Sequence, residues 1–160
     1  MSVEYRRGAL RDLEPGTLYR IMWLRLRVFV VEQQAAYPEL DGRDLEPDAE
    51  LFWAEEGGAV VATLRLLHDA DSVAAAGAGD GAVARIGRVA TDASARGRGI
   101  AAELVRRAVA RSEERWPRHP IVLDAQQHLG DWYARFGFVV SGEAFEEDGI
   151  PHVPMRRPAS

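Results

Sequence analysis

Residues 85–105 read RIGRVATDASARGRGIAAELV. Apolar residues predict a strand over 84–89, and their later spacing predicts a helix over 98–116. Between the two, a pair of arginines alternates with a pair of glycines: Arg96, Gly97, Arg98 and Gly99. Glycines leave backbone N–H groups uncovered at the positive end of a helix dipole, which suits this junction to phosphate oxygens. The arginines favour a pyrophosphate; the alternative is an ordinary glycine turn with solvated arginines.

The rest of the chain alternates extended and helical patterns. The predicted elements are a short strand at 3–7, a helix from the N-cap Thr17 to about Phe29, two strands at 51–55 and 60–67 joined by a Gly57-Gly58 hairpin, the strand at 84–89, the helix at 98–116, a strand at 121–125, a short helix at 129–136, and strands at 138–141 and 153–156. An Asp/Ala/Gly-rich stretch at about 68–81 is expected to be a long, mobile, exposed loop. This order indicates a single α/β domain over 1–160 with mixed strand pairing.

The composition contains neither cysteine nor lysine, and all 20 basic residues are arginine. Codon bias in a GC-rich genome is the simplest origin of both absences. Without cysteine, the chain forms no disulfide, thiolate metal site or acyl-cysteine intermediate. Without lysine, it has no P-loop lysine and no lysine base, so a grip on phosphate must come from arginine and backbone.

Bulk charge and apolar runs narrow the partners. The net charge of −5 argues against nucleic acid, because nucleic-acid-binding domains usually carry a basic excess. The polar start, Met1 to Arg11, has no signal-peptide core, and the longest apolar runs, 21–24 and 28–31, are far shorter than the roughly 20 residues of a membrane span. The expectation is a cytoplasmic protein that binds no membrane. The four histidines show no metal-ligand spacing, so no metal is expected.

Nucleotide-binding motifs fit the junction less well. A Walker A sequence is absent, and residues 97–102 give only a degenerate G-x-G-x-x-A. Asp124, the acidic residue that should follow on the next strand, comes too late for a dinucleotide site. A nucleotide-binding oxidoreductase is therefore the weaker alternative.

Several segments together resemble the GNAT N-acetyltransferase superfamily. Arg96-Gly-Arg-Gly-Ile-Ala101 resembles its acetyl-CoA motif R/Q-x-x-G-x-G/A, residues 87–91 resemble its bulged strand, and Tyr133-Ala-Arg-Phe-Gly-Phe138 resembles its Y-x-x-x-G-F. The similarity to the ElaA-like branch lies in segments 24–33, 37–42, 125–129 and 147–155. The resemblance covers nearly the whole chain. It implies a GNAT-like α/β fold: a mixed, mostly antiparallel twisted sheet with helices on both faces.

The resemblance also implies a reaction: direct transfer of acetyl from acetyl-CoA, as co-substrate, to an amine of a small molecule or peptide. The residues then expected to bind the cofactor are Val89, Ala90, Thr91, Arg96, Gly97, Arg98, Gly99, Ile100, Ala101 and Gln126. Gln126 departs from the family pattern, which often has asparagine seven residues before the tyrosine, but its longer amide still reaches a pantetheine arm. The backbone N–H of Val89 is expected to polarise the thioester carbonyl. The acceptor side is expected to include Phe29, Gln33 and His128.

The same resemblance assigns catalytic candidates. Tyr133 is expected to protonate the departing thiolate; the alternative is a core tyrosine packed on Phe136. The general base is left open between Glu32, His152 and an ordered water, since a helix-end surface carboxylate and a strand-edge histidine are the alternatives for the two side chains. The alternative to an enzyme is a GNAT-like fold that binds acyl-CoA as a sensor or partner module. A homodimer is compatible with the resemblance.

Overall fold

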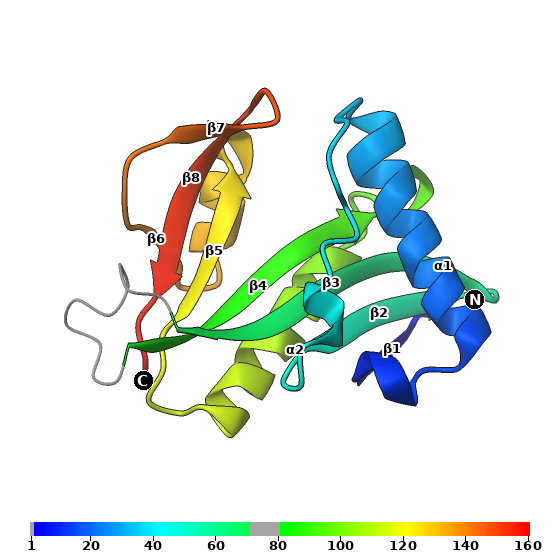
Figure 1. Cartoon of the computed structure of the whole chain (residues 1–160), viewed down its shortest axis with the longest axis horizontal. Helices are drawn as coiled ribbons and strands as arrows, with labels where there is room; N and C mark the ends of the chain where they lie inside the picture. Colours follow the sequence, from blue (N-terminus) through cyan, green and yellow to red (C-terminus); the bar gives the residue numbers. More distant parts are fainter. Residues whose placement is uncertain (1, 71–80) are drawn as a thin grey trace. The chain divides into compact units, whose positions relative to one another are not determined.

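The computed structural model describes residues 2–70 and 81–160. Its helices and strands are β1 (Glu4–Gly8), α1 (Pro15–Leu26), β2 (Glu50–Glu56), β3 (Ala59–Ala70), β4 (Ala82–Thr91), α2 (Ile100–Arg115), β5 (Ile121–Gln126), α3 (Gly130–Ala134), β6 (Val139–Val140), β7 (Phe145–Glu147) and β8 (Ile150–Arg157) (Figure 1). A π-helical segment, Arg27–Glu32, directly follows α1, and single 3₁₀ turns lie at Leu10–Asp12, Arg43–Leu45, Ala93–Ala95 and Gln127–Leu129. Of the loop predicted at about 68–81, residues 71–80 lie outside the described residues, and the part before them is strand.

The strands are hydrogen-bonded in the order β1-β2-β3-β4-β5-β8-β6, with β7 paired to β8. β2 runs antiparallel to β1 and β3, and β8 runs antiparallel to β5, β6 and β7. The β4–β5 pair is parallel, at Ala84–Ile121 and Arg85–Val122. The predicted mixed, mostly antiparallel sheet is therefore confirmed. Two compact units are described separately below: the first contains the chain up to Leu67 with Arg88–Arg107, and the second contains His68–Gly87 with Ala108–Ser160.

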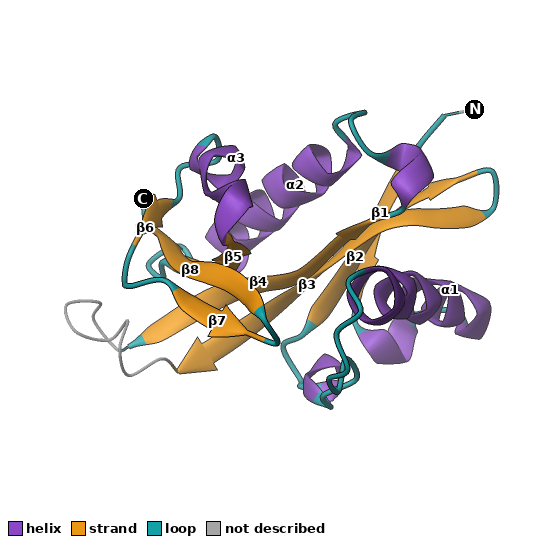
Figure 2. Cartoon of the chain, turned by 90° about the horizontal axis from the view of Figure 1, so that it is seen from above, coloured by secondary structure: helices purple, strands orange, loops and turns teal. Residues whose placement is uncertain are grey.

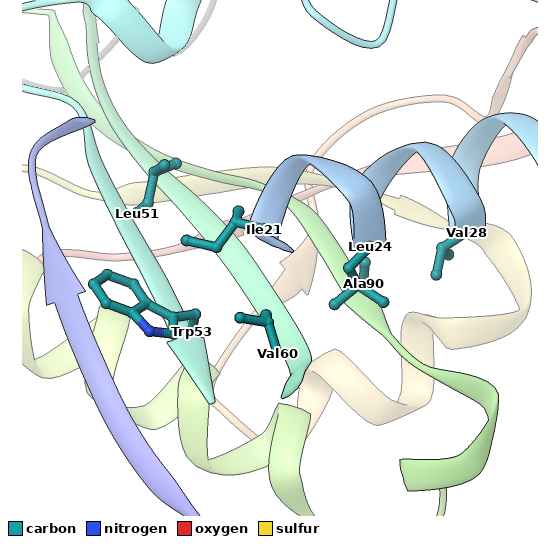
Figure 3. Close-up of a cluster of buried hydrophobic side chains, with 7 residues drawn as sticks. All are labelled: Ile21, Leu24, Val28, Leu51, Trp53, Val60 and Ala90. Carbon is teal, nitrogen blue, oxygen red and sulfur yellow. The ribbon is translucent and has the colours of Figure 1, made fainter. Parts of the chain in front are cut away.

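In the first unit, α1 packs on one face of β2 and β3. Its buried residues follow helical spacing and meet the strands in one apolar cluster: Ile21, Leu24, Val28, Leu51, Trp53, Val60 and Ala90 (Figure 3). Burying each large aliphatic side chain of this kind stabilises the fold by about 1.5–3 kcal/mol. This cluster fixes the far end of β4, where Ala90 lies, against α1.

The start of α1 differs from the predicted one. The helix begins at Pro15, and the side chain of Glu14, not of Thr17, accepts a hydrogen bond from the N–H of Gly16 (3.1 Å). Proline is well suited to the first helical position, because its missing N–H would have no helical partner there. Thr17 instead lies inside the first turn and donates its hydroxyl to Glu14 (3.2 Å).

The opposite face of the same strands is covered by α2. Phe52 and Ala54 alternate with the residues that face α1 and are also buried, so both faces of β2 are covered. Figure 2 shows α1 and α2 on opposite sides of β1, β2 and β3. The guanidinium of Arg107 on α2 stacks over the ring of Tyr5 on β1, 4.7 Å from its centroid. The expected helices on both faces are confirmed.

The second unit is built on the β5–β8 pair. Their register matches Leu123 with Met155 and Gln126 with His152, and Leu123 and Met155 are buried. α3 follows β5 through a 3₁₀ turn and ends at Ala134, so it is shorter than the predicted helix over 129–136. Gly137, with φ of +90°, lies in the turn that follows α3. This unit therefore places α3 immediately after the end of a buried strand.

One strand was missed by the sequence reading. β7 lies between the predicted strands at 138–141 and 153–156, and its three residues are exposed. It forms a hairpin with β8 through Asp148 and Gly149, whose φ values are +51° and +78°. Two positive φ values characterise the type I′ hairpin turn, for which Asp-Gly is a preferred pair. The Asp-Gly pair was the available signal, since three exposed residues show no apolar alternation.

Within the described residues, no helix combines the length and the apolar character needed to cross a membrane.

Candidate functional site

The turn before α2 leaves the N-terminus of that helix uncovered. Gly97 and Gly99 have φ of +76° and +79°, and a Cβ added to either would meet no atom within 4 Å. Backbone conformation, not packing, therefore requires glycine at both positions. The N–H of Glu103 donates to the carbonyl oxygen of Gly99 (3.1 Å), so the N–H groups of residues 100–102 precede the helical ladder. These donors point out at the positive end of the dipole and can bind an anion.

This geometry corrects the predicted start of the helix. The sequence pattern placed it at Arg98, but α2 begins at Ile100. The left-handed angle of Gly99 is incompatible with a helical residue. The helix therefore starts directly after Gly99, two residues later than predicted. Ile100 is buried and Ala101 is half-buried, whereas residues 96–99 are exposed. The exposed part of the predicted motif is thus the turn itself.

The strand that leads to this turn is anchored at Asp92. The N–H of Asp92 donates to the carbonyl oxygen of Val61 (2.8 Å), and its carboxylate accepts bonds from the N–H and hydroxyl of Ser94 and from Arg27 (2.6 Å). The hydroxyl bond from Ser94 is the main reason that the pKa of Asp92 lies below its ordinary value. The bonds with Arg27 and Val61 thus tie the approach to the turn to the π-helical segment after α1 and to β3.

Both arginines of the turn are bound to carboxylates. Arg96 donates to Glu32 (Nη2–Oε2, 2.6 Å) and to the carbonyl oxygen of Thr91 (3.1 Å). Arg98 holds Glu56 with both terminal nitrogens, at 2.9 and 2.5 Å. The bond from Arg98 lowers the pKa of Glu56. Both guanidinium groups are more than 40% exposed, so an anion that reaches the turn competes with the carboxylates of Glu32 and Glu56 for them.

Glu32, a predicted base, lies at the end of the π-helical segment. Its side chain is 43% exposed and faces Arg96. The ion pair occupies the carboxylate that would accept a proton. Phe29, predicted on the acceptor side, packs partly buried against the α1 cluster, and Gln33 ends the segment with its N–H donating to the carbonyl oxygen of Val28 (3.2 Å).

The residues predicted to run beside pantetheine, 89–91, form the end of β4 that leads to the turn. Ala90 is buried in the α1 cluster, whereas Val89 and Thr91 are half-buried and point away from it by strand alternation. Arg88, just before them, has a φ of +52°. A left-handed residue inside a strand breaks the regular ladder as a bulge does. The predicted irregularity of this strand is therefore present at Arg88.

In the second unit, Tyr133 lies on α3 and is 6% exposed. Its ring meets Trp132 (4.8 Å between centroids) and Phe138 (6.3 Å) edge to face; Phe136, the partner expected for a core tyrosine, contacts Trp132 instead. Burial raises the pKa of Tyr133 well above its ordinary value. The hydroxyl is protonated at neutral pH with or without this shift, and the raised pKa makes it a weaker acid than a solvated tyrosine.

Gln126 and His152 are register partners across the β5–β8 pair. His152 Nδ1 lies 2.8 Å from the carbonyl oxygen of Ile150, and the imidazole stacks on Phe145 with 5.7 Å between centroids. A carbonyl oxygen only accepts, so Nδ1 carries the proton in this contact and Nε2 of neutral His152 is the acceptor. The contact gives His152 the tautomer that a general base requires.

His128 lies in the 3₁₀ turn after β5 and is exposed. It lines an open cavity of about 550 Å³ together with polar Gln127 and Asp131 and with apolar Phe138 and Met155. The second unit thus brings Gln126 beside His152 and sets His128 at a cavity, while the first unit brings Arg96, Glu32 and Thr91 together. No three histidine or acidic side chains of the described residues are grouped as metal ligands.

A set of residues beside the bulge was missed by the sequence reading. Arg88 donates to Glu39 (3.0 Å) and to Asp41 (3.2 Å), which belong to the segment between α1 and β2. The pairing joins residues 47 and 49 positions apart in sequence, so no local pattern signals it. The family resemblance drew attention to residues 37–42 but not to their partner on β4.

Comparisons with known proteins complete the picture of the chain. The profile of a family described as an acetyltransferase (GNAT) domain matches residues 23–158. A UPF0039 protein of Mycobacterium tuberculosis is 44% identical over 161 residues, covering 100% of this chain and 96% of that protein. Among solved structures, Escherichia coli ElaA superposes with a TM-score of 0.86 at 32% identity, covering 98% of this chain and 99% of ElaA. An acyl-CoA N-acyltransferase from Pseudomonas aeruginosa superposes with a TM-score of 0.85 at 39% identity, covering 98% and 99%.

Proposed function

The chain belongs to the GNAT acetyltransferase family and is ElaA-like, and from this premise we propose that it transfers acetyl from acetyl-CoA directly to an amine of a small molecule or peptide. The family and the structural neighbours indicate acyl transfer in general. The acetyl donor and the amine acceptor are the parts proposed here.

The observation that carries the proposal is the turn at residues 96–99. Two left-handed glycines expose the first N–H groups of α2, and two surface arginines flank them. In the proposal, these N–H groups bind the pyrophosphate of CoA, and Arg96 and Arg98 exchange their carboxylate partners for phosphate oxygens. Gly97 and Gly99 let the phosphates approach the backbone closely, because no side chain covers it.

The end of β4 serves the thioester in this proposal. Val89 and Thr91 offer backbone groups to the pantetheine arm, while buried Ala90 holds the strand on α1. Gln126 of the second unit supplies an amide to the same arm. The N–H of Val89 donates to the thioester carbonyl oxygen, where negative charge develops as the amine attacks.

Proton movements complete the reaction. A base removes a proton from the amine, the new N–C bond forms, the C–S bond breaks, and the thiolate of CoA leaves. Tyr133 is proposed to protonate it; because a thiol pKa of about 8.5 already makes the thiolate a tolerable leaving group, the acid contributes modestly. Glu32, His152 and an ordered water are the proposed bases, and the Nε2 of His152 has the required lone pair. Phe29, Gln33 and His128 are proposed to contact the acceptor.

Release of free thiol from acetyl-CoA, measured against a panel of amines, tests the proposal. We expect thiol release that depends on the amine, with the acetylated amine found by mass spectrometry. Tyr133→Phe removes one oxygen and should lower kcat by about tenfold while leaving the KM for acetyl-CoA nearly unchanged. CoA binding by calorimetry without turnover on any amine would instead favour a non-catalytic acyl-CoA-binding module, and a thermal shift with NADH but not with CoA would refute the cofactor assignment.

A further inference from the structure

Arg88 has a backbone conformation that its residue type does not favour. Its φ of +52° lies in the left-handed region, which side chains with a Cβ disfavour. Gly87, immediately before it, could adopt that region freely but does not. The chain therefore places arginine, not the adjacent glycine, at the one left-handed position of β4, which implies that contacts of the arginine side chain hold it there.

Those contacts come from the segment between α1 and β2. The Nε of Arg88 donates to Oε2 of Glu39 (3.0 Å), and Nη2 donates to the carbonyl oxygen of Glu39 (3.3 Å) and to Oδ2 of Asp41 (3.2 Å). The guanidinium also lies over the ring of Tyr37, 5.5 Å from its centroid. Three hydrogen bonds hold the Nε and Nη2 groups of the guanidinium, and the ring of Tyr37 lies against its face.

The acceptors of Arg88 are themselves immobilised. The carboxylate of Glu39 is 0% exposed and accepts further bonds from Arg25 (2.7 Å) and from the hydroxyl of Tyr37 (2.6 Å). Asp41 accepts two parallel bonds from Arg65, at 2.8 and 3.0 Å. A fork of this kind fixes the carboxylate in its plane as well as in position.

The group of charges is balanced. It contains three arginines and three carboxylates: Arg25, Arg65, Arg88, Glu39, Asp41 and Asp44. We refer to these six residues as the arginine–carboxylate network. Arg25, Arg65, Glu39 and Asp44 are buried, so opening a pair among them would leave a desolvated charge, and this part of the network resists small displacements. Arg88 and Asp41, 21% and 24% exposed, join it at its edge. It gives β4 a fixed reference at the residue before Val89.

The peptide group that joins Arg88 to Val89 is oriented by the backbone angles of Arg88. We propose that Arg88 is a positioning residue, held left-handed by Glu39 and Asp41 so that the N–H of Val89 points at the carbonyl oxygen of the bound thioester. This inference rests on the proposed function, because it assigns the N–H of Val89 to that oxygen. The network then contributes to the reaction without touching the substrate.

Two substitutions separate this role from a merely conformational one. Arg88→Gly keeps a residue that accepts a positive φ but removes every side-chain contact, and Arg88→Lys keeps the charge without the fork of donors. The matched control is Arg6→Ala, which removes an exposed arginine of the first unit that is paired with Glu4 and Glu55. All variants are compared by thermal melting, CoA affinity and initial rates of thiol release from acetyl-CoA.

We expect Arg88→Gly to bind CoA within about threefold of the unaltered protein and to lose about 10- to 100-fold in kcat, because a donor that points away is lost in the transition state only. The kcat of Arg88→Lys should fall between those of Arg88→Gly and the unaltered protein. Arg6→Ala should keep both the CoA affinity and the kcat of the unaltered protein. If glycine preserves kcat, the position needs only a positive φ, and the proposal is wrong. A loss of kcat that merely follows the unfolded fraction, and that cooling restores, would also overturn it.

Nuclear magnetic resonance distinguishes failure of this inference from failure of the proposed function. If the unaltered protein releases no thiol with any amine, acetyl transfer fails as the function. The amide resonance of Val89 still reports on Arg88: it should shift in Glu39→Gln, which weakens the hold on Arg88 without altering a sequence neighbour of Val89, and stay in place in Arg6→Ala. An unchanged Val89 resonance in Glu39→Gln would refute the positioning role independently of turnover.

Discussion

Two arginine–carboxylate pairs of the first unit have nearly the same geometry and opposite surroundings. Arg25 and Glu39 meet at 2.7 Å with side chains 1% and 0% exposed, whereas Arg96 and Glu32 meet at 2.6 Å with side chains 45% and 43% exposed. Distance therefore does not distinguish them. Burial distinguishes the two pairs, because it decides whether water can hydrate each charged group when the ion pair opens.

An exposed pair exchanges its partner for water, so it contributes about 0–1 kcal/mol and opens readily. A buried pair has no such exchange, and loss of one member leaves the other charge desolvated. The comparison teaches that the same chemical group serves two purposes in this unit. Arginines at the turn are available to a phosphate, and arginines of the network are committed to the fold.

The largest effect should follow from removing the central carboxylate of the network. Glu39→Ala removes the carboxylate that accepts from the Nε of Arg25, the Nε of Arg88 and the hydroxyl of Tyr37. Arg25 keeps its bonds to Asp44 and Arg88 its bond to Asp41, so each guanidinium loses one of its two carboxylate partners. We expect the free energy of unfolding to fall by about 3–5 kcal/mol, measured by urea denaturation at neutral pH.

The matched variant is Glu56→Ala, which removes the half-buried carboxylate that holds Arg98, an arginine whose own side chain is 43% exposed and turns to water when the pair opens. Here the free energy of unfolding should change by less than about 1 kcal/mol. Equal losses in Glu39→Ala and Glu56→Ala would show that burial does not separate the two kinds of pair.

The next effect concerns ligand binding. Arg96→Ala and Arg98→Ala each remove one guanidinium from the turn but leave its backbone donors in place. Each change should weaken CoA binding by about 3- to 10-fold in calorimetry, and more steeply at low salt, with the free energy of unfolding unchanged within about 0.5 kcal/mol. Arg6→Ala serves as the control for a general loss of positive charge. If both turn variants bind CoA like Arg6→Ala, phosphate recognition does not involve these arginines.

The turn could be predicted from sequence because all of its determinants are local. Glycines at 97 and 99, the arginines between and before them, and the apolar spacing of α2 lie within a few residues of each other. The order of most elements along the chain followed from periodicity, and the mixed, mostly antiparallel sheet with helices on both faces followed from the family resemblance. The errors were local too: Glu14 replaced Thr17 as the cap, and exposed β7 gave no alternation to detect.

The network could not be predicted in the same way. Its bonds join α1 to the following segment and that segment to β3 and β4, with separations of up to 49 residues. A charged residue in the sequence looks equally suited to the surface, and nothing local to Arg25 names the carboxylates that it binds. Only packing reveals that Arg25 is 1% exposed, and only the backbone angle reveals that Arg88 needs its partners.

A smaller effect is expected at Asp41, the partly exposed carboxylate of the network, and concerns the dependence of stability on pH. Burial alone would raise the pKa of Asp41, but the bonds from Arg65 and from the N–H of Arg43, with the charges of Arg65 and Arg88, outweigh it and lower the pKa to about 2. In the unfolded chain the ordinary value is 3.8. A lowered folded-state pKa means that the ionised form stabilises the fold above about pH 4, and that this stabilisation is lost as the pH falls toward 2.

Asp41→Asn tests this contribution because it removes the titration and keeps the shape. The side chain of Asp41 is 24% exposed, so solvent screens part of this contribution. We expect the free energy of unfolding of the unaltered protein, measured relative to that of Asp41→Asn by urea denaturation, to be about 1 kcal/mol larger at pH 6 than at pH 2.5. Asp131→Asn, at an exposed position on α3, is the control. Parallel pH profiles for the two variants would place Asp41 with the surface pairs, since a carboxylate that exchanges arginine for water at no cost has no folded-state preference for its charged form.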